Sequence, residues 1–218
     1  MAKLRPSSQR WLKEHRDDPF VQRAKREGYR SRAAYKLLEL QGMLHDKAGK
    51  VRPLIKPGAH VVELGAAPGG WTQVAVNLAG PEGRVLGVDL LEMDPVPGAE
   101  ILQGDFLDQA VLDEIRARLP DFGRVDVVLS DMAPNMTGYK SADQGRGELL
   151  AECAFEFAEE ALVIGGGICF KMFQGPGFDE LVRRARLEFT QVKTVKPEAS
   201  RSRSPELYLV GLDFKGAR

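Results

Sequence analysis

The chain has 218 residues, of which 43% are hydrophobic and 28% are charged, enough for one sizeable domain with a buried core. No apolar run approaches the roughly 20 residues that cross a bilayer, and the basic N-terminus lacks the apolar stretch of a secretory signal, so we expect a cytoplasmic protein with no membrane partner. The two cysteines, Cys153 and Cys169, have no His or Cys partner at metal-ligand spacing, and we expect no metal.

The formal net charge of zero conceals two parts of opposite sign. Residues 1–56 contain 15 Lys and Arg against 6 Asp and Glu, whereas the rest of the chain contains 16 and 25. Aromatic residues such as Trp11 and Tyr29 lie among the basic residues, which favours a nucleic-acid contact over a merely solvated tail. We therefore expect residues 1–56 to be a basic extension whose helices contact a nucleic acid, and residues 57–218 to form the main domain.

The elements alternate along the chain. Short basic helices are predicted over 7–18 and 20–27, and a third helix begins near Ser31, a possible N-cap, and ends near Met43. Strands then alternate with helices. The predicted strands are 60–64, 84–88, 99–103, 125–130, 167–173, 189–195 and 206–213, and the predicted helices are 70–79, 107–118, 146–163 and 177–187.

This alternation predicts an α/β fold with a seven-stranded, mostly parallel sheet and helices on both faces. The connection 197–205 is too short for a helical crossover, so the last strand should enter as an antiparallel hairpin. A sheet of this kind matches a Rossmann-like class I methyltransferase better than a six-stranded dinucleotide-binding domain.

A glycine-rich turn follows the first predicted strand of the sheet. Residues 61–73 read VVELGAAPGGWTQ, the pattern of a strand, a tight loop and a helix N-terminus. Gly65 and Gly69 allow the backbone to approach a ligand closely. The spacing is not Gly-x-Gly-x-x-Gly, which disfavours a nicotinamide dehydrogenase and points to a cofactor without a phosphate, commonly S-adenosylmethionine. Packing alone could also explain such a turn.

Three carboxylates follow successive strands. Asp89 is placed to accept hydrogen bonds from ribose hydroxyls, Asp105 from an adenine amino group, and Asp131 faces the reacting end of the cofactor. Each could be an ordinary helix N-cap when taken singly. Together with Gly69 and Trp71 they predict a cofactor pocket. The polar loops 132–145 and 174–177 are interpreted as walls over the acceptor substrate.

Six segments, in family order, make the chain similar to the FtsJ/RrmJ family of ribosomal RNA 2′-O-methyltransferases, and most similar to its bacterial members that act on the large subunit. The resemblance covers nearly the whole chain from about residue 8. The matching segments are 31–37, 64–71, 103–106, 130–135, 171–175 and 196–206.

The resemblance implies a catalytic Lys-Asp-Lys-Glu set at Lys36, Asp131, Lys171 and Glu206, called the tetrad below. It also implies methyl transfer from S-adenosylmethionine to a ribose 2′-hydroxyl of ribosomal RNA, a uridine of 23S rRNA in the large subunit, by a monomer. Lys171 is expected either to accept the hydroxyl proton as a neutral base or to stabilise alkoxide character as a cation, and the sequence does not choose between these roles.

RNA contacts are expected from the basic extension, including Arg32, and from Arg201 and Arg203 beside Glu206. The serine and arginine run 200–204 could instead be a solvated hairpin turn. Two other functions remain open at this point: a tRNA ribose 2′-O-methyltransferase, and a non-catalytic RNA-binding factor in ribosome assembly. An intact tetrad argues against the second.

Overall fold

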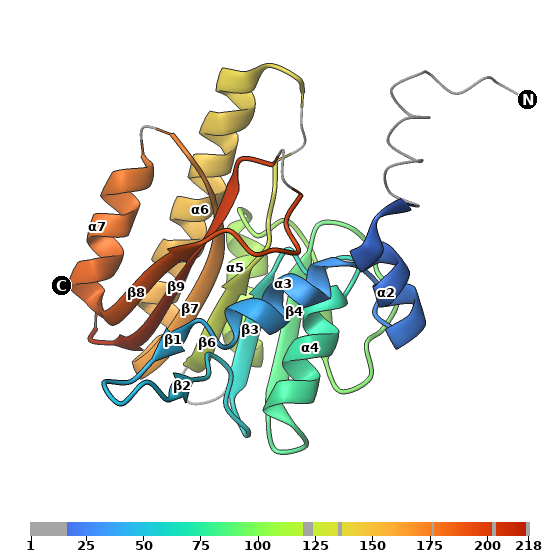
Figure 1. The fold of residues 1–218 in the computed structure, drawn as a ribbon, viewed down its shortest axis with the longest axis horizontal. Coiled ribbons are helices and arrows are strands. Elements are labelled where there is room, and N and C mark those ends of the chain that lie inside the picture. The colour runs from blue at the N-terminus through green and yellow to red at the C-terminus, as the bar shows by residue number, and fades with distance from the viewer. Residues whose placement is uncertain (1–16, 120–123, 135–136, 176, 202–203, 217–218) are drawn as a thin grey trace, which may run out of the picture.

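The structure is a computed structural model that describes residues 17–119, 124–134, 137–175, 177–201 and 204–216, so the helix predicted over 7–18 falls mainly outside the described residues. A β-sheet with helices packed around it dominates the fold (Figure 1). Its elements are α2 (Pro19–Glu27), α3 (Ala33–Leu40), β1 (Leu44–His45), β2 (Val51–Arg52), β3 (His60–Leu64), α4 (Gly70–Ala79), β4 (Arg84–Asp89), β5 (Glu100–Gln103), α5 (Gln109–Arg118), β6 (Val125–Ser130), α6 (Lys140–Ala161), β7 (Leu162–Phe173), α7 (Phe178–Glu188), β8 (Phe189–Val195) and β9 (Glu206–Phe214).

The main sheet has seven strands in the order β5-β4-β3-β6-β7-β9-β8. Strands β3 to β7 pair in parallel, whereas β9 lies between β7 and β8 and is antiparallel to both. The predicted seven-stranded sheet with an antiparallel last strand is therefore confirmed. Strands β8 and β9 are joined by a short connection and form a hairpin. As a result β9, the last strand of the chain, lies inside the sheet between β7 and β8, and β8 forms the edge.

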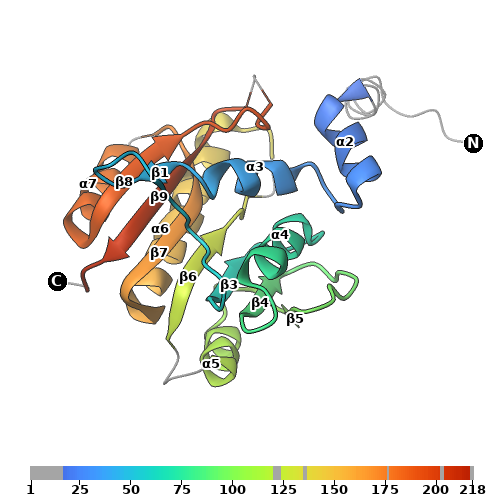
Figure 2. The same cartoon turned by 60° about the horizontal axis from the view of Figure 1, so that its bottom comes forward.

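Helices cover both faces of the sheet, as predicted (Figure 2). Helices α5, α6 and α7 share one hydrophobic core with one face, in which Phe155 and Phe170 are fully buried. Helices α3 and α4 share a second core with the other face, around Trp71 and Tyr208. The alternation of side chains along each strand supplies both cores, because neighbours such as Val61 and Val62 point to opposite faces.

Some element boundaries differ from the prediction. Helix α6 begins at Lys140, six residues early, because Gly145 and Gly147 are tolerated inside a long helix packed on the sheet. Strand β7 begins at Leu162 because the run Gly165-Gly166-Gly167 continues the strand. The two-residue strands of the β1–β2 hairpin were not predicted.

The expected helix cap at Ser31 is wrong. Helix α3 begins at Ala33 with Arg32 in the N-cap position, and no side chain caps it. The Ser31 hydroxyl is instead buried against the start of α4, where a Cβ on Gly70 would lie 2.3 Å from it. Asp18 does cap α2, since its carboxylate accepts a hydrogen bond from the Phe20 N–H at 2.9 Å.

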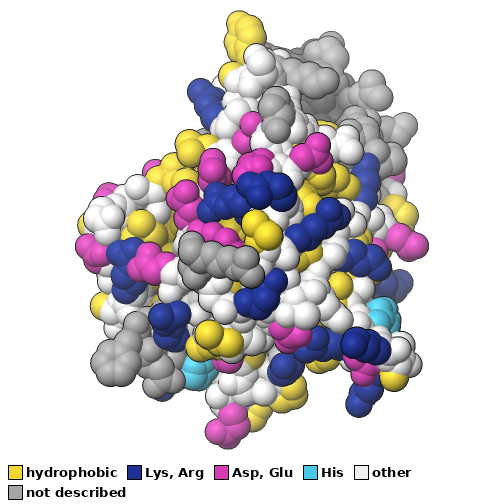
Figure 3. Space-filling view, turned by 90° about the vertical axis from the view of Figure 1, so that its left-hand side faces the viewer, with side chains coloured by type: hydrophobic (Ala, Val, Ile, Leu, Met, Phe, Trp, Pro, Cys, Tyr) yellow, Lys and Arg dark blue, Asp and Glu magenta, His cyan; other side chains and the backbone are white. Residues whose placement is uncertain are grey.

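The boundary expected at residue 56 is not a boundary in packing. Leu37 and Leu40 of α3 and Leu44 of β1 lie in the same core as α4 and the sheet. On the side of the molecule where α7 lies in Figure 1, Lys and Arg side chains lie next to Asp and Glu side chains (Figure 3). Helix α7 itself carries an ion pair between Arg183 and Glu180.

Candidate active site

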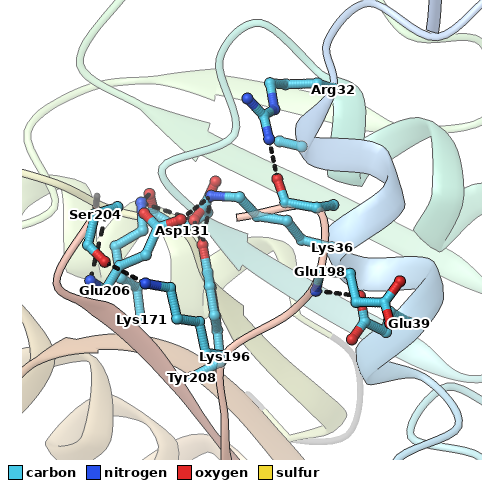
Figure 4. Close-up of polar contacts among 12 residues, drawn as sticks. Arg32, Lys36, Glu39, Asp131, Lys171, Lys196, Glu198, Ser204, Glu206 and Tyr208 are labelled. Atoms are coloured by element: carbon cyan, nitrogen blue, oxygen red, sulfur yellow. Dashed lines mark hydrogen bonds and ion pairs between the residues drawn. The ribbon is translucent and has the colours of Figure 1, made fainter. Parts of the chain in front are cut away.

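The ends of three strands and one helix bring the tetrad together (Figure 4). Asp131 directly follows β6, and Lys171 lies near the end of the neighbouring strand β7. Glu206 begins β9, where it pairs with Phe173 of β7, and Tyr208 pairs with Lys171 two positions further. Residues two apart on a strand point to the same face, so Glu206 and Tyr208 face α3 together.

Helix α3 supplies the fourth member from the other side. Lys36 is on the buried face of α3, between Ala34 and Leu37, and only 11% of its side chain is exposed. Because the helix packs on α4 and the sheet, the long lysine side chain reaches over the strand ends. All four tetrad residues therefore meet, although they come from positions 36 to 206.

The tetrad forms two ion pairs. Lys171 Nζ lies 2.7 Å from Asp131 Oδ1 and also donates to the Asp131 carbonyl oxygen at 2.9 Å. Lys36 Nζ lies 2.7 Å from Glu206 Oε1. The exposed fractions of these side chains are between 7% and 17%, so both pairs are largely buried but still in contact with solvent.

Tyr208 connects the two pairs, and the sequence analysis did not identify it. Its hydroxyl donates to Asp131 Oδ1 at 2.5 Å and accepts from Lys36 Nζ at 3.0 Å. Its ring is fully buried and packs on Trp71, with the ring centroids 5.6 Å apart. The spacing of two residues from Glu206 in an alternating strand is a signal that could have identified it.

The electrostatics keep both carboxylates ionised. Burial acts to raise the pKa of Asp131, but the charges of Lys171 and Lys36 and the hydrogen bonds from Lys171 and Tyr208 outweigh it and lower that pKa. The same balance, with Lys36 as the main partner, lowers the pKa of Glu206. Burial, with the nearby Asp131 carboxylate, raises the pKa of Tyr208 well above its usual value, so Tyr208 acts as a neutral donor.

The glycine loop lies beside this cluster. Gly65 has a φ of +81°, and a Cβ there would lie 2.9 Å from the backbone nitrogen of Met132, the residue after Asp131. Glycine is therefore required to bring the end of β3 against the end of β6. At the next strand, Asp89 accepts hydrogen bonds from the N–H groups of Ala67 and Leu91, both at 2.8 Å, which fixes its carboxylate at the mouth of the loop.

Gly69 and Trp71 form the beginning of α4. Gly69 is the N-cap, with a φ of +103°, and the first N–H groups of the helix are directed into the loop. The Trp71 side chain is 2% exposed, and its Nε1 donates to the Ala33 carbonyl oxygen at 2.7 Å. The indole therefore joins α4 to α3 and is buried between them. Asp105 is exposed after β5 and accepts from the Leu107 N–H at 2.9 Å.

The residues expected to contact RNA are in different situations. Arg32 is 15% exposed, and its guanidinium is bonded to the Asp18 carboxylate and the Ala199 carbonyl oxygen, so it anchors the 196–204 connection. A second anchor is the Glu198 N–H, which donates to Glu39 at 2.8 Å (Figure 4). Arg201 lies on this connection and is partly exposed, whereas Arg203 lies outside the described residues.

The two predicted loop walls contact each other. Asp143 fastens the first wall, because its carboxylate accepts from the N–H and hydroxyl of Thr137, at 2.8 and 2.7 Å, and from the Gly138 N–H at 3.0 Å. Gln144 Nε2 then donates to the Gln174 carbonyl oxygen of the second wall at 3.0 Å. Both loops are thus attached to the first turns of α6.

Among the described residues, no group of three or more His, Cys, Asp or Glu side chains has an arrangement that could hold a metal ion. None of the described helices is both long enough and apolar enough to cross a bilayer.

Comparison with known proteins gives the family of the fold and the site. The family model for FtsJ-like methyltransferases matches residues 29–214. A ribosomal RNA large subunit methyltransferase E of Magnetococcus marinus is 68% identical over 216 residues, covering 99% of this chain and 100% of the relative. The protein of the same name from Acidithiobacillus ferrooxidans is 52% identical over 210 residues, covering 96% of this chain and 91% of the relative.

Solved structures agree with this. A Plasmodium falciparum protein described as a ribosomal RNA methyltransferase superposes with a TM-score of 0.72 at 30% identity, covering 87% of this chain and 100% of that chain. Fibrillarin of Aeropyrum pernix, solved with S-adenosyl-L-methionine, has a TM-score of 0.55 at 17% identity, covering 84% of this chain and 75% of that chain, which shows the shared class I fold alone.

Proposed function

The chain belongs to the FtsJ-like methyltransferase family, and from this premise we propose that it transfers a methyl group from S-adenosylmethionine to a ribose 2′-hydroxyl of large-subunit ribosomal RNA, at a uridine of 23S rRNA. The observation that carries the proposal is the arrangement of two linked ion pairs, Lys171–Asp131 and Lys36–Glu206. They lie at the edge of the sheet where the glycine loop ends.

The residues around the glycine loop fit the cofactor. The first N–H groups of α4 are donors suited to the carboxylate of its methionine part. Asp89, held by two backbone N–H groups, has further lone pairs with which to accept ribose hydroxyls, and Asp105 is exposed at the next strand for the adenine amino group. S-adenosylmethionine, when bound, supplies an electrophilic methyl group on a sulfonium.

The chemistry that remains for the protein is to orient a weak nucleophile and manage its proton. We place the 2′-hydroxyl beside Lys171 Nζ, which is buried at 8% exposure and held by both the carboxylate and the carbonyl oxygen of Asp131. This double contact fixes the direction of the amine, and positioning of this kind accounts for much of the rate gain in transfer reactions. As a neutral amine, Lys171 would accept the hydroxyl proton while the 2′-oxygen takes the methyl group from the sulfonium. As an ammonium, it would stabilise negative charge that develops on the 2′-oxygen, and the proton would leave to solvent.

The other members of the site support Lys171. Lys36 and Glu206 form the second ion pair. The Tyr208 hydroxyl accepts a hydrogen bond from Lys36 and donates one to Asp131, so it links the two pairs. We propose that Lys36 and Glu206 line the acceptor ribose, because they come from α3 and β9, the elements next to the RNA-facing segments. A lone carboxylate or lone lysine at this depth would be costly, and the pairing explains why both can be buried.

The RNA-facing surface is proposed to consist of the basic segment 1–56 and the 196–204 connection, with Arg201 and Arg203 as phosphate contacts. Arg32 is reassigned from direct contact to holding this connection through Ala199. The large-subunit names of the relatives favour ribosomal RNA over tRNA, and the complete tetrad favours an enzyme over a non-catalytic assembly factor.

We propose further that the enzyme acts as a cytoplasmic monomer without a metal. Each carboxylate of the tetrad is already balanced by a lysine at 2.7 Å, which leaves no surplus negative charge there for a cation.

The test is methyl transfer from labelled S-adenosylmethionine to large ribosomal subunits that lack their own methylation, followed by nucleoside analysis. Label in a 2′-O-methyluridine is expected with the wild type and is expected to be lost in Lys171→Ala. Lys193→Ala is the matched control, because Lys193 is exposed on β8 away from the site. Methyl transfer to tRNA but not to subunits would overturn the assignment of ribosomal RNA as the substrate. No methyl transfer to either RNA, with the cofactor still bound, would overturn the proposal that the protein is an enzyme.

A further inference from the structure

Arg30 lies between the RNA-facing helix α2 and the loops that form the cofactor site. It follows the C-cap of α2 at Gly28 by two residues and precedes α3 by three. The glycine loop on one side and the 91–95 segment after β4 on the other line a common hollow of about 760 Å³, and Arg30 lines it too.

The Arg30 guanidinium is bonded to both loops. Nη1 donates to the Asp94 carbonyl oxygen at 2.5 Å and to the Pro68 carbonyl oxygen at 3.3 Å, and Nη2 donates to the Pro95 carbonyl oxygen at 2.6 Å. The planar fork of Arg30 serves the three carbonyls from two separate nitrogens, whereas the three donors of a lysine leave one nitrogen and do not reach the same positions together.

Two further contacts seat Arg30 on the cofactor loop. A Cβ on Gly69 would lie 3.0 Å from Arg30 Nη1, so the guanidinium packs directly on the loop glycine. The Arg30 N–H donates to Gln73 Oε1 at 2.8 Å, and Gln73 Nε2 donates to the Gly28 carbonyl oxygen at 3.0 Å. These bonds attach the end of α2 to the first turns of α4.

We infer that Arg30 is a positioning residue of the cofactor site: it holds the glycine loop and the 91–95 segment at a fixed separation and joins both to α2. The inference rests on the proposed function, because it assigns the site between these loops to S-adenosylmethionine. It separates Arg30, like Arg32 and Lys36, from the basic residues of the extension that are proposed to contact RNA.

The test is calorimetric titration of the full chain, without RNA, with S-adenosylhomocysteine, and the variants are Arg30→Ala and Arg30→Lys. Both are expected to raise the dissociation constant about ten-fold, because carbonyl partners are lost in each. At saturating cofactor, the kcat of Arg30→Lys should stay near wild type while its KM for the cofactor rises. Arg26→Ala is the control, since Arg26 is 76% exposed on α2 and is expected to leave cofactor affinity unchanged.

The outcomes distinguish the two proposals. If Arg30→Lys binds the cofactor product like the wild type, Arg30 acts through its charge, and the inference is overturned. An unchanged dissociation constant in Arg30→Ala overturns it as well, and if Arg30→Ala does not fold, Arg30→Lys decides alone. Failure of the wild type to bind S-adenosylhomocysteine would instead contradict the proposed function.

Discussion

The Tyr208 hydroxyl donates a 2.5 Å hydrogen bond to Asp131, the carboxylate that also pairs with Lys171. The same hydroxyl accepts a hydrogen bond from Lys36. One neutral group therefore couples the two charged pairs, so the position of each lysine depends on the other through Asp131 and Tyr208.

The first prediction concerns this coupling. Tyr208→Phe keeps the ring on Trp71 but removes the shared hydroxyl, and kcat should fall about 10- to 100-fold with little change in cofactor affinity. Single-turnover methyl transfer measures the effect. Tyr35→Phe is the control: it removes a hydroxyl that donates to Glu27 at 2.9 Å, away from the tetrad, and should leave kcat near wild type. Equal kcat values in both variants and the wild type would show that the coupling is dispensable.

The second prediction concerns RNA affinity. Arg201→Glu combined with Arg203→Glu should weaken RNA binding. The slope of log K against log salt concentration should become less steep by the equivalent of about two phosphate contacts, while cofactor affinity stays unchanged. The measurement is RNA binding across a salt titration, with cofactor titration alongside. Unchanged RNA binding at every salt concentration would rule out this surface.

The third prediction concerns the first loop wall. Asp143→Ala removes the acceptor for Thr137 and Gly138, so the loop after Asp131 should loosen and KM for the RNA substrate should rise about ten-fold. Steady-state kinetics with varied RNA measures this. Asp108→Ala is the control, because Asp108 caps α5 through the Ala110 N–H and its loss should lower stability by about 1 kcal/mol without raising KM. A similar KM in both variants would contradict the assignment.

The fourth prediction concerns pH and stability. Burial, with Glu159 nearby, raises the pKa of Glu188 to about 7. Its folded-state pKa is higher than in the unfolded chain, so its stabilising contribution is complete below the unfolded pKa of about 4.5 and is lost as the pH rises through about 7. Glu188→Gln does not ionise and should therefore exceed the wild type in free energy of unfolding at pH 8, by about 1 kcal/mol, and by much less at pH 5, which is close to the unfolded pKa.

Urea denaturation at the two pH values measures this difference. Glu180→Gln is a control of opposite sign, since a hydrogen bond from Arg183 lowers the pKa of Glu180. An advantage of Glu188→Gln that is equal at both pH values would mean that ionisation of Glu188 is not its cause.

Much of the fold could be predicted from sequence because its signals are local. Strands such as 60–64 and 125–130 are short, mainly apolar runs that are followed directly by a glycine or an aspartate. The structure gives both strands the same bounds. The antiparallel last strand followed from a connection too short for a crossover. The β1–β2 hairpin was missed because strands of two residues carry no periodicity, and the early start of α6 was hidden by Gly145 and Gly147.

The site was less accessible to sequence reasoning, because its contacts join distant parts of the chain. The tetrad came from family motifs, and no spacing along the chain reveals that Lys36 meets Glu206. The engagement of Arg32 by Asp18 and Ala199, and of Arg30 by three carbonyls, depends on loops that pack only in the folded state. A basic residue in a basic segment therefore does not by itself indicate a nucleic-acid contact.

The residues expected to bind the cofactor and those expected to catalyse methyl transfer come from different parts of the chain, and β9 supplies part of the second group. The glycine loop, Asp89 and Asp105 all belong to the first half of the chain and to neighbouring strands β3, β4 and β5. Glu206 and Tyr208 arrive only when β9 inserts between β7 and β8, two strands that precede it in the chain. The cofactor residues therefore lie on strands that pair with one another without β9, whereas the tetrad is complete only where β9 lies between β7 and β8.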